Sequence, residues 1–465
     1  MLTAVAHFSP FNCTANKAAH TVFVIDKAHC ETWLNTQTQT IQNWLEANLF
    51  KADPGQILAL PDPQYQIHSF VLGIDPNDSL YCLGDLSDRL HEGLYRIEDP
   101  YHLLKKESAY LGFALGTYRF QHFVAERQKK AVQLQISAAE YDKLSPQVEA
   151  LFWVRDLINL PAESLGPSQL ALEAQELAKV YHADCTITVG NALLEEGYPL
   201  IHAVGRASDE APRLVELHWG NPAHPKISLV GKGVCFDSGG LDIKSAEGMS
   251  TMKKDMGGAA HALGLARMIM EAKLPIRLQV LVPIVENAIN GHAFRPGDIF
   301  ISRKGLSVEI GNTDAEGRLI LADALTKASE NQPELMVDFA TLTGAARIAL
   351  GHTVAALFCN HDELATGLLK ASAENQDPIW RMPLYAGYKK MIRGKFADLN
   401  NMPNHSYGGA ITAALFLEYF VGPSIPWAHF DLNAWNASAQ PGRPEGGEAM
   451  AIRAVFGYLV ERYAR

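Results

Sequence analysis

Short apolar runs alternate with polar segments over roughly the first third of the chain. The apolar runs TVFVID (21–26) and SFVLGI (69–74) predict buried strands. The segment TWLNTQTQTIQNWLEANLF (32–50) has the spacing of one amphipathic helix. Together these patterns predict a small α/β domain over residues 1–140, and no group of reactive side chains stands out in it.

A long helical pattern follows this part of the chain. Between Ala138 and Asn159 the apolar residues recur at helical spacing, and Pro161 and Pro167 then interrupt the pattern. We therefore predict that residues 141–167 form a linking helix and loop between two domains.

From about Ser168 the pattern changes to alternating strands and helices. The predicted strands are ISLV (227–230), LQVLVPIV (278–285) and LMVDF (335–339), and helices are predicted after Gly258 and Gly317. Strands this apolar are buried on both faces, which is typical of a parallel sheet covered by helices. The predicted fold class is α/β with two domains. The larger C-terminal domain, residues 168–465, has a mainly parallel central sheet flanked by helices.

Composition limits the classes of function. A chain of 465 residues is too long for one compact core, and 48% hydrophobic with 20% charged residues is ordinary globular composition. The net charge of −11 gives no general attraction to nucleic acid, so nucleic-acid binding is not expected.

Cysteine spacing and apolar runs bear on the compartment. The six cysteines form no C-x-x-C pair and are predicted to be free thiols in a reducing compartment. The start MLTAVAHFSPFNCTANKAAH lacks the basic and apolar regions of a secretory signal, and no run has the length of a membrane span. We therefore predict a cytoplasmic enzyme with no membrane association.

The candidate chemistry lies in two glycine-rich segments, residues 231–258 and 311–319. They contain four carboxylates and three cationic side chains: Asp237, Asp255, Asp314, Glu316, Lys232, Lys244 and Arg318. Four carboxylates cannot share one site in ionised form without cations among them. Two divalent metals would balance the charge, so the pattern predicts a two-metal hydrolase if the segments meet in space.

The first segment follows a predicted strand. The strand at 227–230 would place Lys232 and Asp237 just beyond its C-terminal end, the edge at which open α/β sheets bind ligands. Oxygen ligands alone suit magnesium, calcium or manganese, whereas a neutral lysine amine shifts the preference toward zinc, manganese or cobalt. Cys235 is predicted to be structural.

The second segment carries its acidic residues at alternate positions. If the loop is extended, Asp314 and Glu316 face the same side on either side of Ala315. A helix beginning near Gly317 would direct its positive end at the same region. In isolation each aspartate is as readily a capping residue, Lys244 a solvated lysine and Arg318 a helix partner of Asp314, but the joint pattern favours a metal site.

These segments closely resemble the cytosolic leucyl aminopeptidase family of hexameric di-metal peptidases. The octapeptide NTDAEGRL (312–319) matches the family signature at every position. The flanking pieces also agree: VGKG (230–233), FDSGG (236–240), KKDMGGAA (253–260), VPIVENAING (282–291), RPGD (295–298), FATLTGA (339–345) and GGAITAALFL (408–417). The resemblance covers roughly residues 150–440 and is loose over 1–140.

The resemblance implies a ligand set for two metal ions, zinc or manganese. Asp237 and Glu316 would each contact both ions. Lys232 and Asp255 would complete the tighter site, and Asp314 the exchangeable one. A water bridging the ions would be the nucleophile, and one ion would hold the free α-amine of the peptide.

The resemblance also implies catalytic and substrate-binding residues. Lys244 would bind the substrate and polarise the scissile carbonyl, and Arg318 would hold a bicarbonate that acts as general base. The pocket for the first residue of the peptide would be lined by Met252, Asn312, Thr341, Leu342 and Gly344. His261 and His292 lie near the motifs but match no family ligand and are predicted to be structural.

The implied substrate is a peptide with a bulky apolar first residue such as leucine. Met252, Thr341 and Gly344 would offer an uncharged pocket, with no carboxylate to pair with a basic side chain and no arginine to pair with an acidic one. Asn433 departs from the family pattern, which usually has a glycine at about this position, and it adds a polar group beside the pocket.

Two other functions compete with the metal-dependent aminopeptidase. A DNA-binding accessory factor of the same family is disfavoured by the acidic balance of the chain. An inactive structural paralogue is disfavoured because every ligand and both catalytic positions are present.

Overall fold

The structure is a computed structural model that describes residues 7–14, 18–124, 131–403, 405 and 407–464. The first six residues of the segment for which no secretory signal is predicted lie outside the described residues. Two compact units divide the chain. The smaller contains Val5–Phe152 and Ser438–Glu445, and the larger contains Trp153–Ala437 and Gly446–Arg465.

The smaller unit is built on a six-stranded sheet. Its strand order is β1 (Phe11–Asn12), β6 (Val132–Gln135), β5 (Gly93–Glu98), β2 (His20–Ile25), β4 (Ile67–Gly73) and β3 (Ile57–Pro61). The pairs are parallel except β3 with β4. The strands predicted at 21–26 and 69–74 are confirmed as β2 and β4, and the expected small α/β domain is present.

The single helix predicted over residues 32–50 is wrong. The segment forms α1 (Cys30–Leu34) and α2 (Gln39–Ala47). The reason is local, because the extended backbone of Thr38 lets its hydroxyl accept a hydrogen bond from Ile41 N and begin a new helix. The smaller unit also contains η1 (Tyr81–Leu83), α3 (Leu86–Arg89) and α4 (Lys106–Gly116).

The long helix predicted between the two halves is present as α5 (Ala138–Asn159). The division between the units falls inside this helix, after Phe152. Pro167 then occupies the first turn of α6 (Pro167–Val180), where a proline costs no helix hydrogen bond.

A nine-stranded sheet forms the centre of the larger unit. The order is β16 (Ile379–Met382), β15 (Ala355–Cys359), β18 (Trp427–Asp431), β14 (Leu335–Ala340), β9 (Lys226–Gly231), β11 (Arg277–Asn287), β8 (Arg213–Trp219) and β7 (Asp184–Val189), with β10 (Gly233–Asp237) paired to β11. The central pairs are parallel, and the antiparallel pairs involve β7, β8 and β15. The predicted mainly parallel sheet is therefore confirmed.

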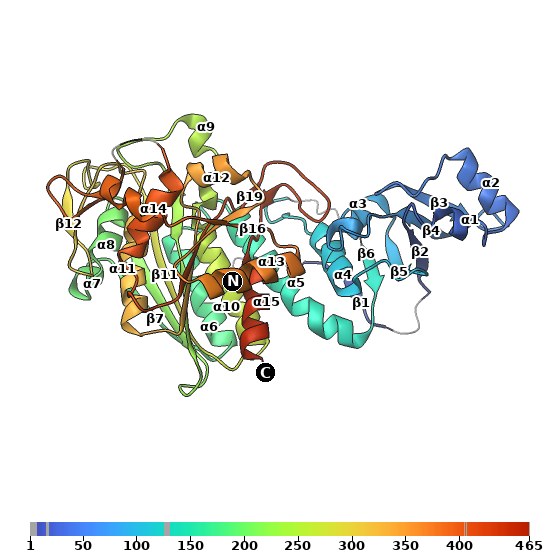
Figure 1. The fold of residues 1–465 in the computed structure, drawn as a ribbon, viewed down its shortest axis with the longest axis horizontal. Helices are drawn as coiled ribbons and strands as arrows, with labels where there is room; N and C mark the ends of the chain where they lie inside the picture. Colours follow the sequence, from blue (N-terminus) through green and yellow to red (C-terminus); the bar gives the residue numbers. More distant parts are fainter. Residues whose placement is uncertain (1–6, 15–17, 125–130, 404, 406, 465) are drawn as a thin grey trace. The chain divides into compact units, whose positions relative to one another are not determined.

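Helices cover both faces of this sheet (Figure 1). On one face α10 (Gly257–Glu271) packs against β9, β14 and α15 (Ile452–Tyr463), which in turn contacts α13 (Asp362–Asn375). On the other face α11 (Gly317–Glu330) packs against β9, β11, α8 (Pro199–Gly205) and α14 (Gly409–Glu418). The helices predicted after Gly258 and Gly317 are α10 and α11.

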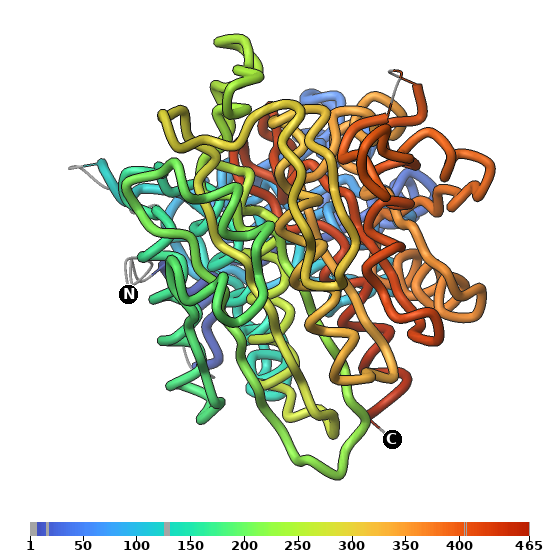
Figure 2. Tube along the Cα trace, turned by 90° about the vertical axis from the view of Figure 1, so that its left-hand side faces the viewer, coloured from blue at the N-terminus to red at the C-terminus, as the bar shows by residue number. Residues whose placement is uncertain are grey.

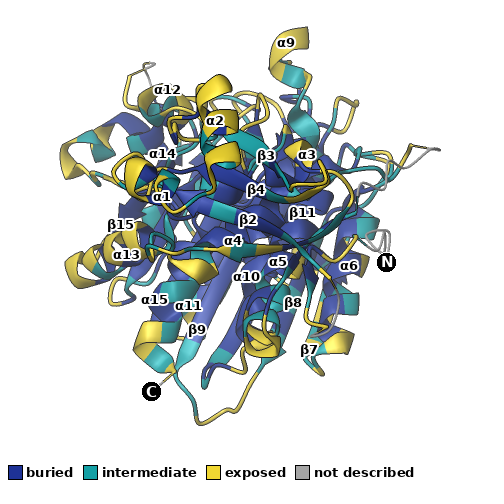
Figure 3. Cartoon of the chain, turned by 90° about the vertical axis from the view of Figure 1, so that its right-hand side faces the viewer, coloured by how far each residue is buried: buried dark blue, intermediate teal, exposed yellow. Residues whose placement is uncertain are grey.

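The central strands β9, β11, β14, β15 and β18 are almost entirely buried, and Figure 3 shows dark blue ribbon at the β11 label. Shorter elements complete the larger unit: α7 (Ala192–Glu195), α9 (Ala246–Met249), η2 (Met252–Met256), β12 (Ile299–Ile301), β13 (Ser307–Glu309), α12 (Gly344–Leu350), η3 (Ala386–Ile392), β17 (Leu399–Asn400), β19 (Trp435–Asn436) and β20 (Gly446–Gly447). The exposed segment that carries α9 projects from this unit (Figure 2). No described helix has both the length and the apolar character needed to cross a bilayer.

A buried ion pair joins α5 to the segment before α15. Arg155 has no exposed side-chain surface, and its guanidinium contacts both carboxylate oxygens of Glu448 at 3.0 and 3.1 Å. Asn436 also donates to Glu448, at 2.6 Å. A charge buried this completely depends on its partner.

Glu448→Ala should lower the free energy of unfolding by roughly 3–5 kcal/mol, because the buried guanidinium of Arg155 would lose its contacts with both oxygens of the Glu448 carboxylate. Urea unfolding of the full chain measures the change. Glu374→Ala, which removes an exposed partner of Lys370, is the control and should cost below about 1 kcal/mol. Equal effects of the two substitutions would contradict the assignment.

Candidate metal centre and substrate cavity

The candidate site lies where parallel strands of the large sheet end. Lys232 follows β9, Thr341 follows β14, and Asp431 is the last residue of β18. Because β9, β14 and β18 are neighbouring parallel strands, their carboxyl ends meet at one edge of the sheet. Asp237 was expected in the loop after 227–230, but it ends a further short strand, β10, because Gly233 and Val234 pair with β11.

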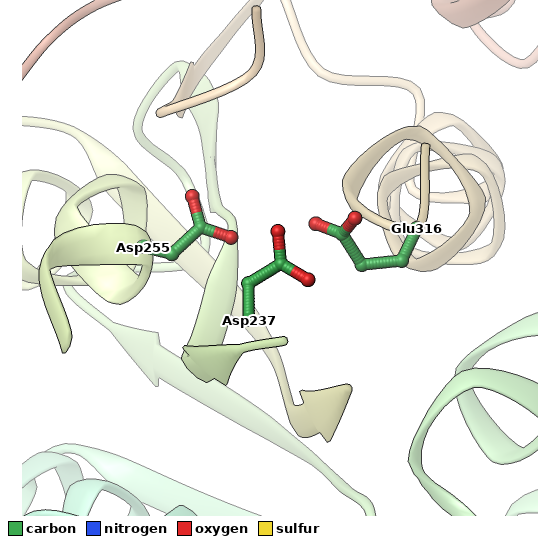
Figure 4. A group of neighbouring side chains, drawn as sticks. All are labelled: Asp237, Asp255 and Glu316. Carbon is green, nitrogen blue, oxygen red and sulfur yellow. The ribbon is translucent and has the colours of Figure 1, made fainter. Parts of the chain in front are cut away.

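Three carboxylates converge at this edge, as Figure 4 shows. Asp237 comes from β10, Asp255 from η2, and Glu316 from the residue that precedes α11. One carboxylate oxygen of each lies within 4.8 Å of the others, and all three residues are buried. The two glycine-rich segments of the sequence therefore meet in space.

Lys232 places a positive charge among these carboxylates. Its Nζ lies 2.8 Å from Asp255 Oδ2 and 2.9 Å from Glu316 Oε1, and it donates to Thr341 O at 2.7 Å. Burial alone would lower the pKa of Lys232, but the carboxylates outweigh it and raise that pKa. A Cβ at Gly317 would lie 2.5 Å from Lys232 Cε, so a larger residue there would push the lysine away from its present position beside the start of α11.

Lys244 and Asp314 form the outer part of the cluster. Lys244 Nζ lies 2.8 Å from Asp237 Oδ2 and also contacts Asp314. Burial would lower the pKa of Lys244, and Asp237 and Asp314 raise it. Lys244 belongs to the exposed segment that leads into α9, whereas the carboxylates it contacts belong to the sheet edge and its loop.

The backbone from Asp314 to Glu316 is not extended, so the condition under which alternation would place both carboxylates on one side is not met. Ala315 N donates to Asn312 O at 3.3 Å and closes a turn, and Glu316 already has helical dihedral angles. The side chain of Asn312 also accepts from Asp314 N at 2.6 Å, which favours the turn. The turn still directs both carboxylates toward the cluster, and α11 begins at Gly317 as predicted.

The donor set fits metal ions. Glu316 Oε2 is buried and has no hydrogen-bond partner among the described residues. Burial raises the pKa of Glu316, and the charge of Asp237 adds to the effect. A carboxylate in this position gains most from a further cation, and buried carboxylate oxygens are ligands for divalent metals.

Several neighbours hold the carboxylates in orientation. Asn287 donates to Asp237 Oδ1 at 2.8 Å and to Thr313 O at 3.1 Å. Thr341 donates its hydroxyl to Asp255 Oδ1 at 2.8 Å. The sequence motifs contain Asn287 but did not indicate this role, which depends on the end of β11 lying beside β10.

Arg318 lies on the first turn of α11 and faces the same region. Its side chain is buried, its Nη1 donates to Asn401 O at 2.6 Å, and its Nε has no partner among the described residues. Burial lowers the pKa of Arg318 to about 10, although Glu316 opposes the shift. Arg318 therefore keeps its charge at neutral pH and retains an unpaired donor.

All residues predicted for the site line one cavity of about 550 Å³. The set is Lys232, Asp237, Lys244, Met252, Asp255, Asn312, Asp314, Glu316, Arg318, Thr341, Leu342 and Gly344. A cavity of this volume is typical of a small-molecule or peptide-end site.

The cavity also contains charged residues that the sequence did not place there. Lys254, Arg347 and Asp431 line it, and Asn433, expected beside the pocket, lines it as well. They come from η2, α12, the end of β18 and the segment after it, and only the sheet order brings them together.

Asp431 is a further carboxylate on the cavity wall, and hydrogen bonds within the protein occupy its oxygens. Its Oδ1 accepts from Leu342 N and Thr343 N at 3.1 Å, and its Oδ2 accepts from the Thr343 hydroxyl at 2.6 Å. Asp431 therefore fixes the loop that carries Leu342 and is not free to act as a base.

The histidines near the motifs have structural surroundings. His261 is fully buried, with Nδ1 2.6 Å from Gly257 O and Nε2 accepting from Met450 N at 2.8 Å. His292 and Cys235 do not line the cavity, and burial raises the pKa of the Cys235 thiol well above its ordinary value.

Fold and site together define a class, enzymes with an α/β fold whose buried carboxylates at the carboxyl edge of a parallel sheet fit metal ions. Residues 152–456 match the catalytic domain of the cytosol aminopeptidase family, and residues 21–136 match the N-terminal domain of M17 aminopeptidases. The chain belongs to the cytosol aminopeptidase family, M17, and the resemblance found in the sequence is confirmed.

Named relatives agree with this family. The chain is 40% identical over 366 residues to a probable cytosol aminopeptidase of Syntrophotalea carbinolica, covering 75% of this chain and 73% of the relative. It is 42% identical over 343 residues to peptidase B of Yersinia pseudotuberculosis, covering 72% of this chain and 79% of the relative.

Solved structures share the whole fold. The crystal structure of cytosol aminopeptidase from Coxiella burnetii has a TM-score of 0.94 and 45% identity, covering 97% of this chain and 99% of that one. The bottromycin maturation enzyme BotP in complex with Mn has a TM-score of 0.86 and 32% identity, covering 96% and 100%. The protein is a metal-dependent aminopeptidase, a metallo-exopeptidase that acts on peptides.

Asn287→Ala should weaken metal binding by about 10- to 100-fold, because Asp237 would lose the amide that orients its carboxylate. Titration of the metal-stripped protein with Mn²⁺ measures the affinity. Asn290→Ala, in the following exposed loop, is the matched control and should bind metal as the wild type does. Unchanged affinity in Asn287→Ala would refute the orienting role.

Proposed function

We propose that two divalent ions, zinc or manganese, act in this cavity to remove the first residue of peptides. Asp237 and Glu316 would contact both ions, Lys232 and Asp255 would complete one site, and Asp314 the other. The observation that carries the proposal is the buried convergence of Asp237, Asp255 and Glu316 around one point. Members of the family depend on a metal pair, and the neighbour BotP has been solved with Mn.

The chemistry of each ligand supports the proposal. Lys232 can serve as a ligand only as a neutral amine, and a bound ion would replace the ammonium charge that now balances Asp255 and Glu316. When bound, the ions would supply an activated water at neutral pH and polarise the scissile carbonyl.

Lys244 and Arg318 are proposed as the catalytic side chains. Asp237 and Asp314 position Lys244 on the cavity wall. There its ammonium would stabilise negative charge on the carbonyl oxygen of the substrate. Arg318 faces the cavity with an unpaired Nε and would hold bicarbonate as the general base. Asp431 is already engaged by Leu342 and Thr343 and is not free to act as the base, which supports this role of the anion.

The substrate is proposed to be a peptide with a free α-amine and a bulky apolar first residue. Met252, Leu342 and Thr341 line the cavity and would contact its side chain, with Asn312 and Gly344 completing the wall. Pockets of this kind separate similar apolar residues by only about 1–3 kcal/mol, so leucine and methionine should both be accepted.

The family also suggests how the protein assembles and where it is located. We infer a homohexamer in the cytoplasm from the family and from relatives named cytosol aminopeptidases. A monomeric mass by light scattering would contradict the assembly. We propose that residues 1–140 form the N-terminal domain, residues 141–167 the linking helix and loop, and residues 168–465 the catalytic domain. Nucleic acid is not expected among the partners.

Active enzyme should contain two metal ions per subunit with unequal affinity, because Asp314 serves only one site. Dialysis against a chelator with metal analysis should remove one ion readily and the second slowly. Asp237→Ala should lose metal outright, since Asp237 serves both sites. Full activity with a single ion bound would reject the two-metal proposal.

Lys244→Ala and Arg318→Ala should each lower kcat by about 100- to 1,000-fold, as expected for groups that stabilise the transition state. Metal content should change far less than kcat, because neither residue is a proposed ligand. Metal analysis and kinetics on the same preparations test this. Collapse of metal occupancy in either variant would show that a ligand has been misassigned.

Leucyl amide should be cleaved and N-acetyl-leucyl amide should not, because the acyl cap removes the amine that anchors the substrate. The two amides are compared at equal concentrations with Mn²⁺-loaded enzyme. Equal cleavage would reject anchoring through the α-amine, whichever first residue is preferred.

A further inference from the structure

Three hydrogen bonds join the loop that carries Lys244 to the neighbouring acidic segment. The hydroxyl of Thr313 accepts from Asp242 N at 2.9 Å and donates to Gly239 O at 2.6 Å. In return, Thr313 N donates to the Asp242 carboxylate, at Oδ2, over 2.8 Å. We call residues 238–244 the lysine loop, and the pair of residues Asp242 and Thr313 therefore fixes this loop through both main chain and side chain.

The two ends of the lysine loop differ in how they are held. At its start, Ser238 donates its hydroxyl to Asn287 O at 2.6 Å, which anchors it on β11. At its end, Lys244 N donates to Ser238 O at 3.0 Å, a bond within the loop itself, and residues 245–248 beyond it are exposed. Asp242 is exposed, whereas Thr313 is fully buried. The pair thus links the exposed part of the loop to the buried side of the centre.

The ion pairs of Lys244 are poorly suited to hold the loop in the working enzyme. Its Nζ contacts Asp237 Oδ2 and Asp314 Oδ1, and both residues are proposed metal ligands. Metal binding would compete with the ammonium for these carboxylate oxygens. The hydrogen bonds between Asp242 and Thr313 involve neither the Lys244 side chain nor a proposed ligand side chain, so they can persist when the ion pairs weaken.

We propose that Asp242 and Thr313 are positioning residues, which hold the lysine loop so that Lys244 faces the scissile carbonyl. The proposal rests on the proposed catalytic role of Lys244. An ammonium on a long side chain acts on the transition state only where its backbone is fixed in advance, and a displacement of about 1 Å can lower the rate about 100-fold. Loss of the Asp242 carboxylate would free the loop without removing a ligand or a catalytic side chain.

A role in stability alone predicts a different outcome. If the pair only stabilises the fold, Asp242→Ala would impair enzyme with and without the Lys244 side chain to the same degree. If Asp242 acts through Lys244, the substitution would matter only while that lysine is present. A double-mutant cycle over these two positions therefore separates the two roles.

A second pair of the same kind provides a matched control. The main-chain N–H and the hydroxyl of Ser307 donate to Asp398 Oδ2 at 2.9 and 2.7 Å, and Asp398 N donates to the Ser307 hydroxyl at 2.9 Å. Asp398 is exposed, and neither residue lines the cavity. Asp398→Ala therefore removes equivalent hydrogen bonds of an exposed aspartate at a distance from the chemistry.

The experiment measures kcat and KM of the full-length, Mn²⁺-loaded enzyme on leucyl amide, with kcat referred to bound metal. The single variants are Asp242→Ala, Asp242→Asn, Lys244→Ala and Asp398→Ala, and the double variant combines Asp242→Ala with Lys244→Ala. Asp242→Asn keeps a side-chain oxygen that can accept from Thr313 N. Two further measurements do not depend on activity: Mn²⁺ titration of the metal-stripped protein, and amide hydrogen exchange of the lysine loop with and without Mn²⁺.

Asp242→Ala should lower kcat at least about tenfold, the expected effect of losing a hydrogen bond to a charged group, with a smaller change in KM. Exchange in the lysine loop should become faster, while Mn²⁺ affinity stays within about twofold. Asp242→Asn should recover most of the lost kcat, and Asp398→Ala should keep the wild-type value. In enzyme that already carries Lys244→Ala, adding Asp242→Ala should change kcat by less than about twofold.

Other results would overturn the inference. Equal losses from Asp242→Ala with and without Lys244 would assign the pair a structural role. A matching loss of Mn²⁺ affinity would show that Asp242 acts through the ligands instead. Wild-type kcat in Asp242→Ala, beside an impaired Lys244→Ala enzyme, would reject this inference alone. Wild-type kcat in Lys244→Ala would reject the proposed role of that lysine and, with it, this inference.

Discussion

The balance of charge among buried carboxylates is the constraint on which the rest of the site depends. Asp237, Asp255 and Glu316 lie within 4.8 Å of one another at a place that water hardly reaches. Such a group is stable only if cations lie among its members. Lys232 and Lys244 are therefore as much a part of the centre as the acids, and the chain is arranged to bring lysines and acids to one point.

The parallel sheet makes this arrangement possible. β9, β14 and β18 end side by side, so residues more than a hundred positions apart in the sequence share one edge. Close backbone approaches complete the centre. A Cβ at Gly258 would lie 2.1 Å from Phe339 O, and one at Gly317 would meet the Lys232 side chain. Glycine at these two positions allows α10 and α11 to begin directly against the strands that carry the ligands.

The positively charged side chains of the cavity fall into two groups. At the metal centre every lysine is matched by carboxylates, which suits the binding and release of metal ions. Away from it, Lys254 and Arg347 form no ion pair with a described residue, and Lys254 instead donates to Asn433 O. Catalysis requires the carboxylates and lysines of the metal centre, whereas Lys254 and Arg347 line the cavity without an ion pair to those carboxylates. Specificity in such a site can therefore change without disturbing the ligands.

The sequence by itself determined the family and the charged residues that form the centre. The motif NTDAEGRL and its companions identified the family, and the strands, α5, α10 and α11 followed from hydrophobic period and helix-terminating residues, because these are local properties. Local reasoning was wrong at Thr38, which starts a new helix, and the condition of an extended loop is not met at Asp314–Glu316, where the chain turns. Only the tertiary structure decided the surroundings of the pocket. Lys254, Arg347 and Asp431 come from three separate elements, and the order of the strands, which no local pattern encodes, brings them to the same cavity.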